Sequence, residues 1–490
     1  MRPKFELLNR ELVERILQEA LDLLMLPGVK VGTAEARDLL AAAGARVEHD
    51  TAHIPQALVQ RALQSTPHEF FLYDRRGRPV IHYGGDHVHF DPGSSCLNVL
   101  DPETWQARPA ESADLIKLVQ VVEILPQYAA QSTAMVCNDV PAQIGDWYRL
   151  LLVLLFSDKP VVTGAFSATT LGTMLALLAA DSGGVDSLRK TPRAVFDVCP
   201  SPPLNWSDFA AHNLVTLARA EVPAEMVSMP LAGATAPVTL AGSVVQHAAE
   251  CLSGITIHQL ARPGAPIVWG GAPAIFDMSA GTAPVGAIET VMLDVACAQV
   301  GKFLGLPTHA YLSATDSKLL DVQAGMESGI SAVLGALMGI NMISGAGMLD
   351  LLACHSVEKL VMDAEAIGYA QRLLRGIEAR TETLALDMFA EAGLRGEFLR
   401  LKTTRALFRQ EQHFPSTVID RGGTPPGEEK QPDILARARQ RVEELVRSYQ
   451  RPEIPVEARS ALLDIARRES AHTGLATLPG LATLQRIAAN

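Results

Sequence analysis

Short apolar segments recur along residues 87–347, and each ends in a small, turn-forming or polar residue. Between consecutive segments lies a stretch long enough for a helix, and most of these stretches carry apolar residues at helical spacing. This alternation predicts parallel strands joined by crossover helices. The eight predicted strands are VHFDPGS (88–94), YAAQSTAM (128–135), PVVTGAF (160–166), AVFDVCP (194–200), AEMVSMPLAG (224–233), PIVWGGA (266–272), PTHAYLSAT (307–315) and INMISGAG (340–347).

Eight such units predict an α/β fold, a closed (β/α)8 TIM barrel over residues 87–377. Residues 1–86 form the predicted N-terminal α+β cap, which closes the bottom of the barrel or packs at its side. The cap is expected to contain helices over 11–24, 34–43 and 55–63 and a β-hairpin that turns at Arg76 and Gly77.

The last barrel helix is predicted over 356–377, with Ser356 as its N-cap. Residues 378–490 form a predicted C-terminal helical extension. It is expected to be mostly helical to residue 415, then a Gly/Pro-rich loop over 421–432 and helices over 432–447 and 455–473.

Composition excludes several classes of protein. A net charge of −12 without a clustered basic face argues against a nucleic-acid partner. The longest aliphatic run, LLLVLLF (150–156), is far shorter than the ~20 residues that span a bilayer, and the charged N-terminus lacks a signal-peptide pattern. Six cysteines without a CxxC pair suit a reducing compartment. We therefore expect a cytoplasmic protein.

Chemistry in a TIM barrel lies at the carboxyl ends of the strands. Aromatic residues are only 5% of the chain, yet four of them fall at predicted strand ends, and a quaternary ammonium binds to aromatic faces by cation–π attraction. Three carboxylates at strand ends add negative charge, and they are equally explained as turn or helix caps. Packing in the core is the alternative for each aromatic residue. These residues are Phe90, Phe166, Trp269 and Tyr311, with Asp91, Asp197 and Asp316.

Familiar catalytic motifs are missing: the chain contains no HExxH, GxSxG or P-loop. Its cysteines and histidines show no spacing typical of a structural zinc site, whereas a catalytic zinc stays open. The run GAGMLD after the eighth strand suggests that the backbone of Gly345 and Gly347 holds a phosphate or carboxylate.

Several long segments resemble the trimethylamine methyltransferase (MttB) family. They cover most of the chain: PLAGATAPVTLAG (230–242), AAECLSGITIHQLARPGAPIVWGG (248–271), GLPTHAYLSATDSKLLDVQAGMES (305–328), SVEKLVMD (356–363), VHFDPGSSCLNVLDPETWQARPAESADL (88–115) and LFRQEQHFPSTVIDR (407–421). The resemblance implies a (β/α)8 methyltransferase that moves a methyl group from a methylamine to the Co(I) of a corrinoid (cobalamin) on a separate protein. The chain has no DxHxxG corrinoid motif, so we expect a cognate corrinoid protein as partner.

Trimethylamine-specific members carry pyrrolysine, whereas this chain is written in standard residues and so resembles the branch that includes glycine betaine methyltransferases. The expected substrate is a quaternary amine, whose departing amine needs no proton, so no general acid or base is required. Phe90, Phe166, Trp269 and Tyr311 would surround the ammonium head. A substrate carboxylate would bind to His309, the backbone of 345–347 or Lys318. Gln323 and Glu327 would orient the Asp316 loop, or simply pack.

Three alternatives stay open. The first is a pyrrolysine enzyme in which the special residue is written as Lys318, and the second is a protein that binds or senses methylated amines without catalysis. A Schiff-base aldolase is disfavoured because no predicted strand contains lysine. The sequence does not identify the amine, and a homo-oligomer is expected.

Overall fold

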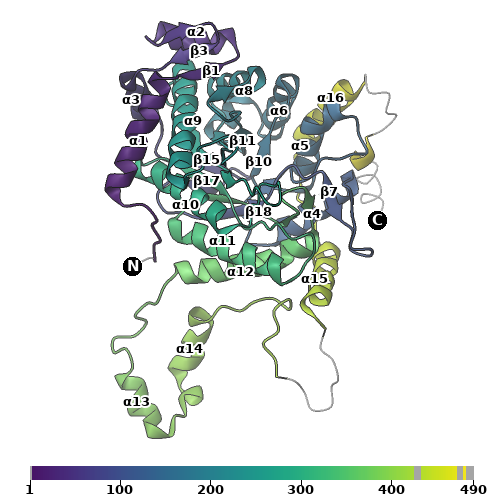
Figure 1. Cartoon of the computed structure of the whole chain (residues 1–490). Coiled ribbons are helices and arrows are strands. Elements are labelled where there is room, and N and C mark those ends of the chain that lie inside the picture. Colours follow the sequence, from purple (N-terminus) through teal and green to yellow (C-terminus); the bar gives the residue numbers. More distant parts are fainter. Residues whose placement is uncertain (1–2, 424–431, 472–477, 482–490) are drawn as a thin grey trace.

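The computed structural model describes residues 3–423, 432–471 and 478–481, and a ring of eight parallel strands lies at its centre (Figure 1). The strand order is β6-β18-β17-β15-β13-β11-β10-β9. The ring closes where the N–H of Ala129 donates a 2.9 Å hydrogen bond to the carbonyl of Phe90. The predicted TIM barrel is confirmed. Its strands are β6 (His89–Pro92), β9 (Gln131–Ser132), β10 (Val161–Gly164), β11 (Ala194–Val198), β13 (Ala224–Met226), β15 (Ile267–Gly271), β17 (Thr308–Tyr311) and β18 (Met342–Ala346).

Helices cover the outside of the ring and run back from the carboxyl end of one strand to the start of the next (Figure 1). Side-chain caps fix where several of them begin. Ser207, Asp321 and Ser356 each accept a hydrogen bond from a backbone N–H in the first turn, and Ser356 is the predicted cap. The helices are α4 (Ser112–Ile124), α5 (Gly145–Phe156), α6 (Ala168–Asp181), α7 (Val185–Lys190), α8 (Asp208–Ala220), α9 (Leu240–Ala261), α10 (Ile288–Phe303), α11 (Val322–Met338) and α12 (Val357–Leu374).

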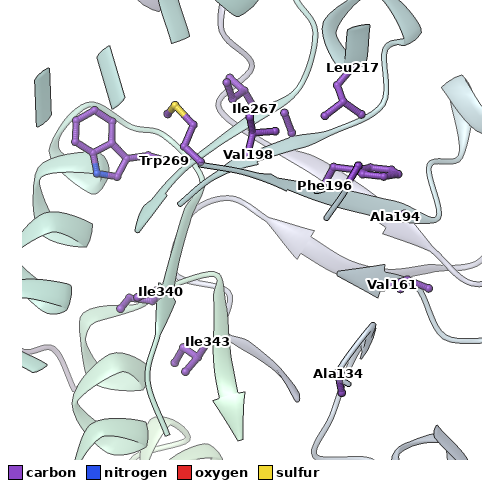
Figure 2. Close-up of a cluster of buried hydrophobic side chains, with 14 of the residues drawn as sticks. Ala134, Val161, Ala194, Phe196, Val198, Leu217, Ile267, Trp269, Ile340 and Ile343 are labelled. Carbon is purple, nitrogen blue, oxygen red and sulfur yellow. The ribbon is translucent and has the colours of Figure 1, made fainter. Parts of the chain in front are cut away.

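Alternation along the strands divides the core in two, because successive side chains of a strand point to opposite faces. Phe196, Trp269 and Ile343 belong to the large cluster between the ring and the helices (Figure 2). A second, smaller cluster fills the lower interior of the ring with Val162, Val195, Val268 and Met342.

The predicted hairpin is confirmed as β4 (Phe70–Tyr73) and β5 (Pro79–Tyr83), and it plugs the bottom of the barrel. Leu72, Ile81 and Tyr83 are fully buried and belong to the same cluster as the inward-facing valines. The amino ends of the strands are therefore sealed by the chain that precedes them.

The rest of the N-terminal region packs at the side of the barrel. The three predicted helices are confirmed as α1 (Arg10–Met25), α2 (Ala34–Ala42) and α3 (Gln56–Ser65), and all three pack against α9. A small sheet not predicted from the sequence joins this region to the barrel. It consists of β1 (Val29–Val31), β2 (Arg46–Glu48) and β3 (Thr51–His53) with β12 (Asn205–Trp206).

Short strands surround the carboxyl end of the barrel, which we call the mouth. One sheet pairs β7 (Asn98–Leu100) and β8 (Ala107–Pro109) with β19 (Met348–Leu349) and β20 (Cys354–His355). A second pairs β14 (Leu231–Ala232) with β16 (Ala274–Ile275). These two small sheets and the loops that connect them form the wall around the mouth.

The C-terminal region contains α13 (Leu386–Ala392), α14 (Lys402–Glu411), α15 (Ile434–Ser448) and α16 (Val456–Ser470), with 3-10 turns at Gly393–Arg395 and Phe398–Arg400. Helix α15 packs on α12 and α4, and α16 packs on α6 and α5. The predicted helices after residue 378 are confirmed where they are described, but most of the predicted loop 421–432 lies outside the described residues. Within the described part of the chain, no helix combines the length and apolarity that a membrane crossing requires.

Candidate active site

Polar side chains replace apolar ones in the upper interior of the barrel. Asp91 on β6, Glu225 on β13, His309 on β17 and Ser344 on β18 are at most 1% exposed. Asp197 on β11 lies at the same level, two residues above Val195. We call these five residues the acidic layer.

Hydrogen bonds and one close polar contact connect the acidic layer from one side of the barrel to the other. Ser344 donates to Asp91 at 2.5 Å, and its hydroxyl lies 3.1 Å from Nε2 of His309. The same nitrogen lies 3.4 Å from Oε1 of Glu225. From below, the Tyr83 hydroxyl of the hairpin donates to Glu225 at 2.9 Å. The plug thus helps to hold the site.

Burial keeps this layer from carrying its full charge in the free protein. Burial, and then the charges of Asp197 and Asp91, raises the pKa of Glu225 well above its usual value. Burial raises the pKa of Asp197 to about 7, against hydrogen bonds from Glu225 and Tyr311 that lower it. Burial also raises the pKa of Asp91 and lowers the pKa of His309 to about 3. Near neutral pH, His309 is therefore uncharged and Asp197 is the carboxyl group poised to ionise.

No lysine or arginine within the described residues forms an ion pair with Asp91, Asp197 or Glu225. A buried carboxylate without a counter-cation is costly unless a cation joins it. The acidic layer therefore has the electrostatic character of a cation site.

A cavity of about 350 Å³ opens from the acidic layer to the mouth. Asp197 and Tyr311 line it, and the Tyr311 hydroxyl donates to Asp197 at 3.2 Å and lies 2.7 Å from the Ser94 hydroxyl. Phe166 and Phe209 contribute two further aromatic walls and are 55% and 39% exposed. The remaining lining is mostly apolar, with Val198, Cys199, Val227, Met229 and Leu352 among its residues.

The structure brings together five of the ten residues singled out from the sequence. Phe166, Asp197 and Tyr311 line the cavity, and Asp91 and His309 lie in the acidic layer with Asp197. Whether they contact a substrate stays a prediction.

Phe90 and Trp269 lie elsewhere, which corrects their expected place around the ammonium head. Both are fully buried in the cluster between strands and helices, and the Trp269 ring points away from the interior (Figure 2). Its Nε1–H donates to the carbonyl of Cys297 at 2.8 Å. A Cβ on Gly301 would come within 2.5 Å of the Trp269 ring, so the helix is packed tightly on it. Strand alternation is the reason, because the inward position next to Trp269 belongs to Gly270.

Gly345, inside β18, and Gly347, just after it, shape the backbone, but the N–H of Gly347 is not free to bind an anion. The N–H of Gly347 already donates to the buried carboxylate of Asp363 at 2.7 Å. Its φ of +85° favours glycine, and a Cβ there would approach His355 to 2.2 Å. Gly345 has a φ of +131°, and a Cβ on it would lie 2.4 Å from the carbonyl oxygen of Leu312.

Asp316 and Lys318 lie outside the cavity. Asp316 accepts hydrogen bonds from the N–H groups of Val285 and Gly286, so it ties two loops together. Lys318 is 68% exposed at its side chain and lies 3.6 Å from Asp350. Glu327 accepts a hydrogen bond from the N–H of Asp316 at 2.9 Å, and Gln323 donates to Glu327, so this pair contacts the Asp316 loop as expected.

Several site residues were not singled out from the sequence. Glu225 was the most recognisable, as a carboxylate inside the apolar run AEMVSM. Ser94 comes from a loop, Phe209 from the first turn of α8 and Tyr83 from the hairpin, so no strand pattern points to them. Among the described residues no group of three His, Cys, Asp or Glu side chains is arranged to hold a metal ion, and all six cysteines are free.

Comparisons with known proteins agree with this architecture. The monomethylamine methyltransferase MtmB of Methanosarcina barkeri has a similar fold, with a TM-score of 0.53 and 11% identity, covering 97% of this chain and 90% of that chain. A hydroxylamine complex of MtmB gives a TM-score of 0.54, with 12% identity and the same shares of the two chains.

Sequence relatives are more informative. The trimethylamine methyltransferase MttB of Desulfitobacterium hafniense is 32% identical over 82% of this chain and 81% of its own length. A glycine betaine methyltransferase of the same species is 26% identical over 93% of this chain and 95% of its own length. The family model described as trimethylamine methyltransferase (MTTB) matches residues 1–473. The chain therefore belongs to the trimethylamine methyltransferase (MTTB) family.

Proposed function

We propose that this protein transfers a methyl group from a quaternary amine of the glycine betaine type to the Co(I) of a corrinoid carried by a separate protein. One observation carries the proposal: Asp197 lies at the base of an aromatic-walled cavity, and no lysine or arginine in the described part of the chain pairs with it. A trimethylammonium head supplies the missing positive charge and presents its methyl groups to ring faces.

The residues of this chain act by binding and orientation. Asp197 attracts the cationic nitrogen, and Tyr311 and Phe166 limit its position, so that one N–CH3 bond points toward the mouth. Orientation of this kind lowers a barrier by as much as ~7–11 kcal/mol. The departing tertiary amine is neutral and needs no proton, which suits a site in which His309 is uncharged and buried.

A bound corrinoid supplies the cobalt nucleophile that accepts the methyl group. The cavity opens at the mouth, where exposed large apolar side chains on loops and on the start of α8 include Leu97, Phe166, Phe209, Met229, Val238 and Met278. An exposed apolar ring of this kind suits docking of a protein partner. This surface fits a corrinoid protein that brings its cofactor to the opening.

A betaine carboxylate would lie toward Ser94 and Ser95. Arg149, directly behind this wall, donates to the Ser95 hydroxyl at 3.1 Å, and its guanidinium lies 5.5 Å from the centre of the Phe166 ring. Arg149 itself lies behind the cavity wall and is paired with Asp146 at 3.2 Å, so the serine hydroxyls are the groups that the wall presents to a carboxylate.

The test is to mix the protein with reduced corrinoid protein and a panel of amines, and to follow the absorbance change from Co(I) to methyl-Co(III). We expect conversion with quaternary amines and loss of that conversion in Asp197→Asn. Conversion with trimethylamine alone would overturn the proposal in favour of a pyrrolysine enzyme, and binding without conversion would favour a sensor. Intact mass spectrometry separately reports whether residue 318 is an ordinary lysine.

A further inference from the structure

An arm of residues 377–412 extends away from the barrel (Figure 1, light green). It contains α13, α14 and the two 3-10 turns between them, and none of these four elements has a buried residue. The arm is held to the rest of the chain at its root, where Arg372 donates to the carbonyl of Glu411 and Arg380 pairs with Glu411 at 2.8 Å.

The arm is rich in large apolar side chains that face solvent. Leu394 is 101% exposed and Leu399 is 86% exposed. Contacts between these side chains are local, as in the pairs Phe389–Phe398 and Phe408–Phe414, whose ring centres lie 5.1 and 5.9 Å apart. The other large apolar residues of the arm and its root that are exposed include Tyr369, Leu373, Ile377, Leu384 and Leu386. A patch of this extent on one chain marks an interaction surface.

The charges of the arm are divided between its two halves. Residues 378–397 contain five acidic and two basic residues, whereas residues 398–412 contain four basic and one acidic. Within the described residues, no ion pair involves the acidic Glu382, Asp387 and Glu391 or the basic Lys402, Arg405 and Arg409. Helix α13 therefore presents unpaired negative charge and α14 unpaired positive charge.

We propose that the arm pairs with the arm of a second copy of this chain. A two-fold axis brings the same surface of each copy together, so each α13 meets the partner's α14. The division of charge is self-complementary under that operation, and the exposed leucines and phenylalanines form the buried centre. A stable interface buries about 800 Å² on each partner, and the large apolar side chains of the arm and its root are numerous enough to supply it.

The position of the arm separates this surface from the mouth. The arm leaves from the carboxyl end of α12, where Gln371 donates to the carbonyl of Gln127, just before β9 begins. This is the bottom end of the barrel, whereas the cavity opens at the top. A corrinoid protein at the mouth would not meet the arm, so the arm can pair with a second copy while the mouth is occupied.

Two charge variants test the pairing by light scattering during size exclusion. In the first, Lys402→Glu, Arg405→Glu and Arg409→Glu make the arm acidic throughout; in the second, Glu382→Lys, Asp387→Lys and Glu391→Lys make it basic throughout. We expect each variant alone to lose the assembly that the unmodified protein forms, and an equimolar mixture of the two to restore it. The control Arg447→Glu, Arg467→Glu and Arg468→Glu adds the same charge on α15 and α16 and should keep the assembly.

A third variant, Leu394→Asp with Leu399→Asp, removes the apolar part of the surface and should also dissociate the protein. These side chains are exposed in the single chain, so far-ultraviolet circular dichroism should stay unchanged. An unmodified protein with the mass of one 52.5 kDa chain would overturn the proposal. So would charge variants that retain the full assembly, or a mixture that fails to recover it.

Discussion

Two layers of side chains lie one above the other inside the same barrel: the lower layer is apolar, and the upper layer consists of polar and ionisable groups. The lower layer contains Val162, Val195, Val268 and Met342 and is sealed by the hairpin. The acidic layer lies one inward position higher on the two strands that both layers share, where Asp197 follows Val195 on β11 and Ser344 follows Met342 on β18. It contains carboxyl groups and an uncharged histidine. On β11 the two layers are separated by only Phe196, which points to the helices.

The comparison shows how a barrel divides stability and chemistry along its axis. Apolar residues at the amino ends of the strands are buried against the β4–β5 hairpin, and their burial stabilises the fold. Carboxyl groups at the carboxyl ends are also buried, but their raised pKa values record an unfavourable environment. Natural sites accept such a loss of stability when function requires it.

The largest expected effect on function comes from Asp197→Asn in the acidic layer. This change keeps the shape of the side chain and removes the charge that we propose meets the substrate. Loss of one partner of a buried charge pair costs about 2–5 kcal/mol, which corresponds to a loss of about 30-fold to 4,000-fold in kcat/KM for methyl transfer. A rate within threefold of the unmodified protein would show that Asp197 does not face the cation.

Its counterpart in the lower layer is Val195→Ala, two residues earlier on the same strand. Truncation of this fully buried side chain should lower the free energy of unfolding by about 2 kcal/mol. The KM for the amine should stay unchanged, because Val195 lies beneath the acidic layer. Urea denaturation and steady-state kinetics on the same preparation measure both quantities, and a raised KM without destabilisation would contradict the division.

The pH dependence of amine binding tests whether Asp197 ionises when the substrate binds. The pKa of Asp197 is about 7 in the free protein, and a bound cation favours its ionised form. Binding therefore releases a proton below pH 7, and the Kd of a quaternary amine should fall by at most about tenfold per unit as pH rises toward 7, then level off. Burial raises the pKa of Glu225 and of Asp91 well above their usual values, and it lowers the pKa of His309 to about 3, so the histidine stays neutral over this range.

Calorimetry in buffers of different ionisation enthalpy measures this proton release. The Asp197→Asn protein serves as the control and should bind weakly with no change between pH 6 and pH 8. Equal affinity of the unmodified protein at both pH values would remove Asp197 from the binding step.

The smallest expected effect belongs to the aromatic wall. Tyr311→Leu removes a ring face and should weaken binding of the amine by about 0.5–2 kcal/mol. Tyr311→Phe keeps the face, loses the hydrogen bonds to Asp197 and Ser94, and should bind more tightly than the leucine variant. If the two variants bind equally, the hydroxyl group rather than the ring is what matters.

Much of the fold follows from local pattern, and much of the site does not. Apolar runs with polar ends located all eight strands, and Ser356 located the start of α12, because both signals depend on nearby residues. Trp269 shows the limit. Its place near a strand end was visible, but whether it points inward depends on the register of the whole ring, and the inward position fell to Gly270.

Glu225 and Tyr83 were missed for a related reason. Each becomes a site residue through a contact between segments 142 positions apart, which no local spacing reports. The anion site expected at Gly347 failed in the opposite way, because Asp363 reaches its N–H from the following helix. In both cases a distant side chain decided what a local motif does.

The hairpin beneath the barrel turns the cavity into a dead end. Substrate and product must pass through the same opening, and on our proposal the partner protein docks at that opening. A docked partner would block release of the demethylated amine. We therefore expect ordered release, in which the partner dissociates first and the amine last.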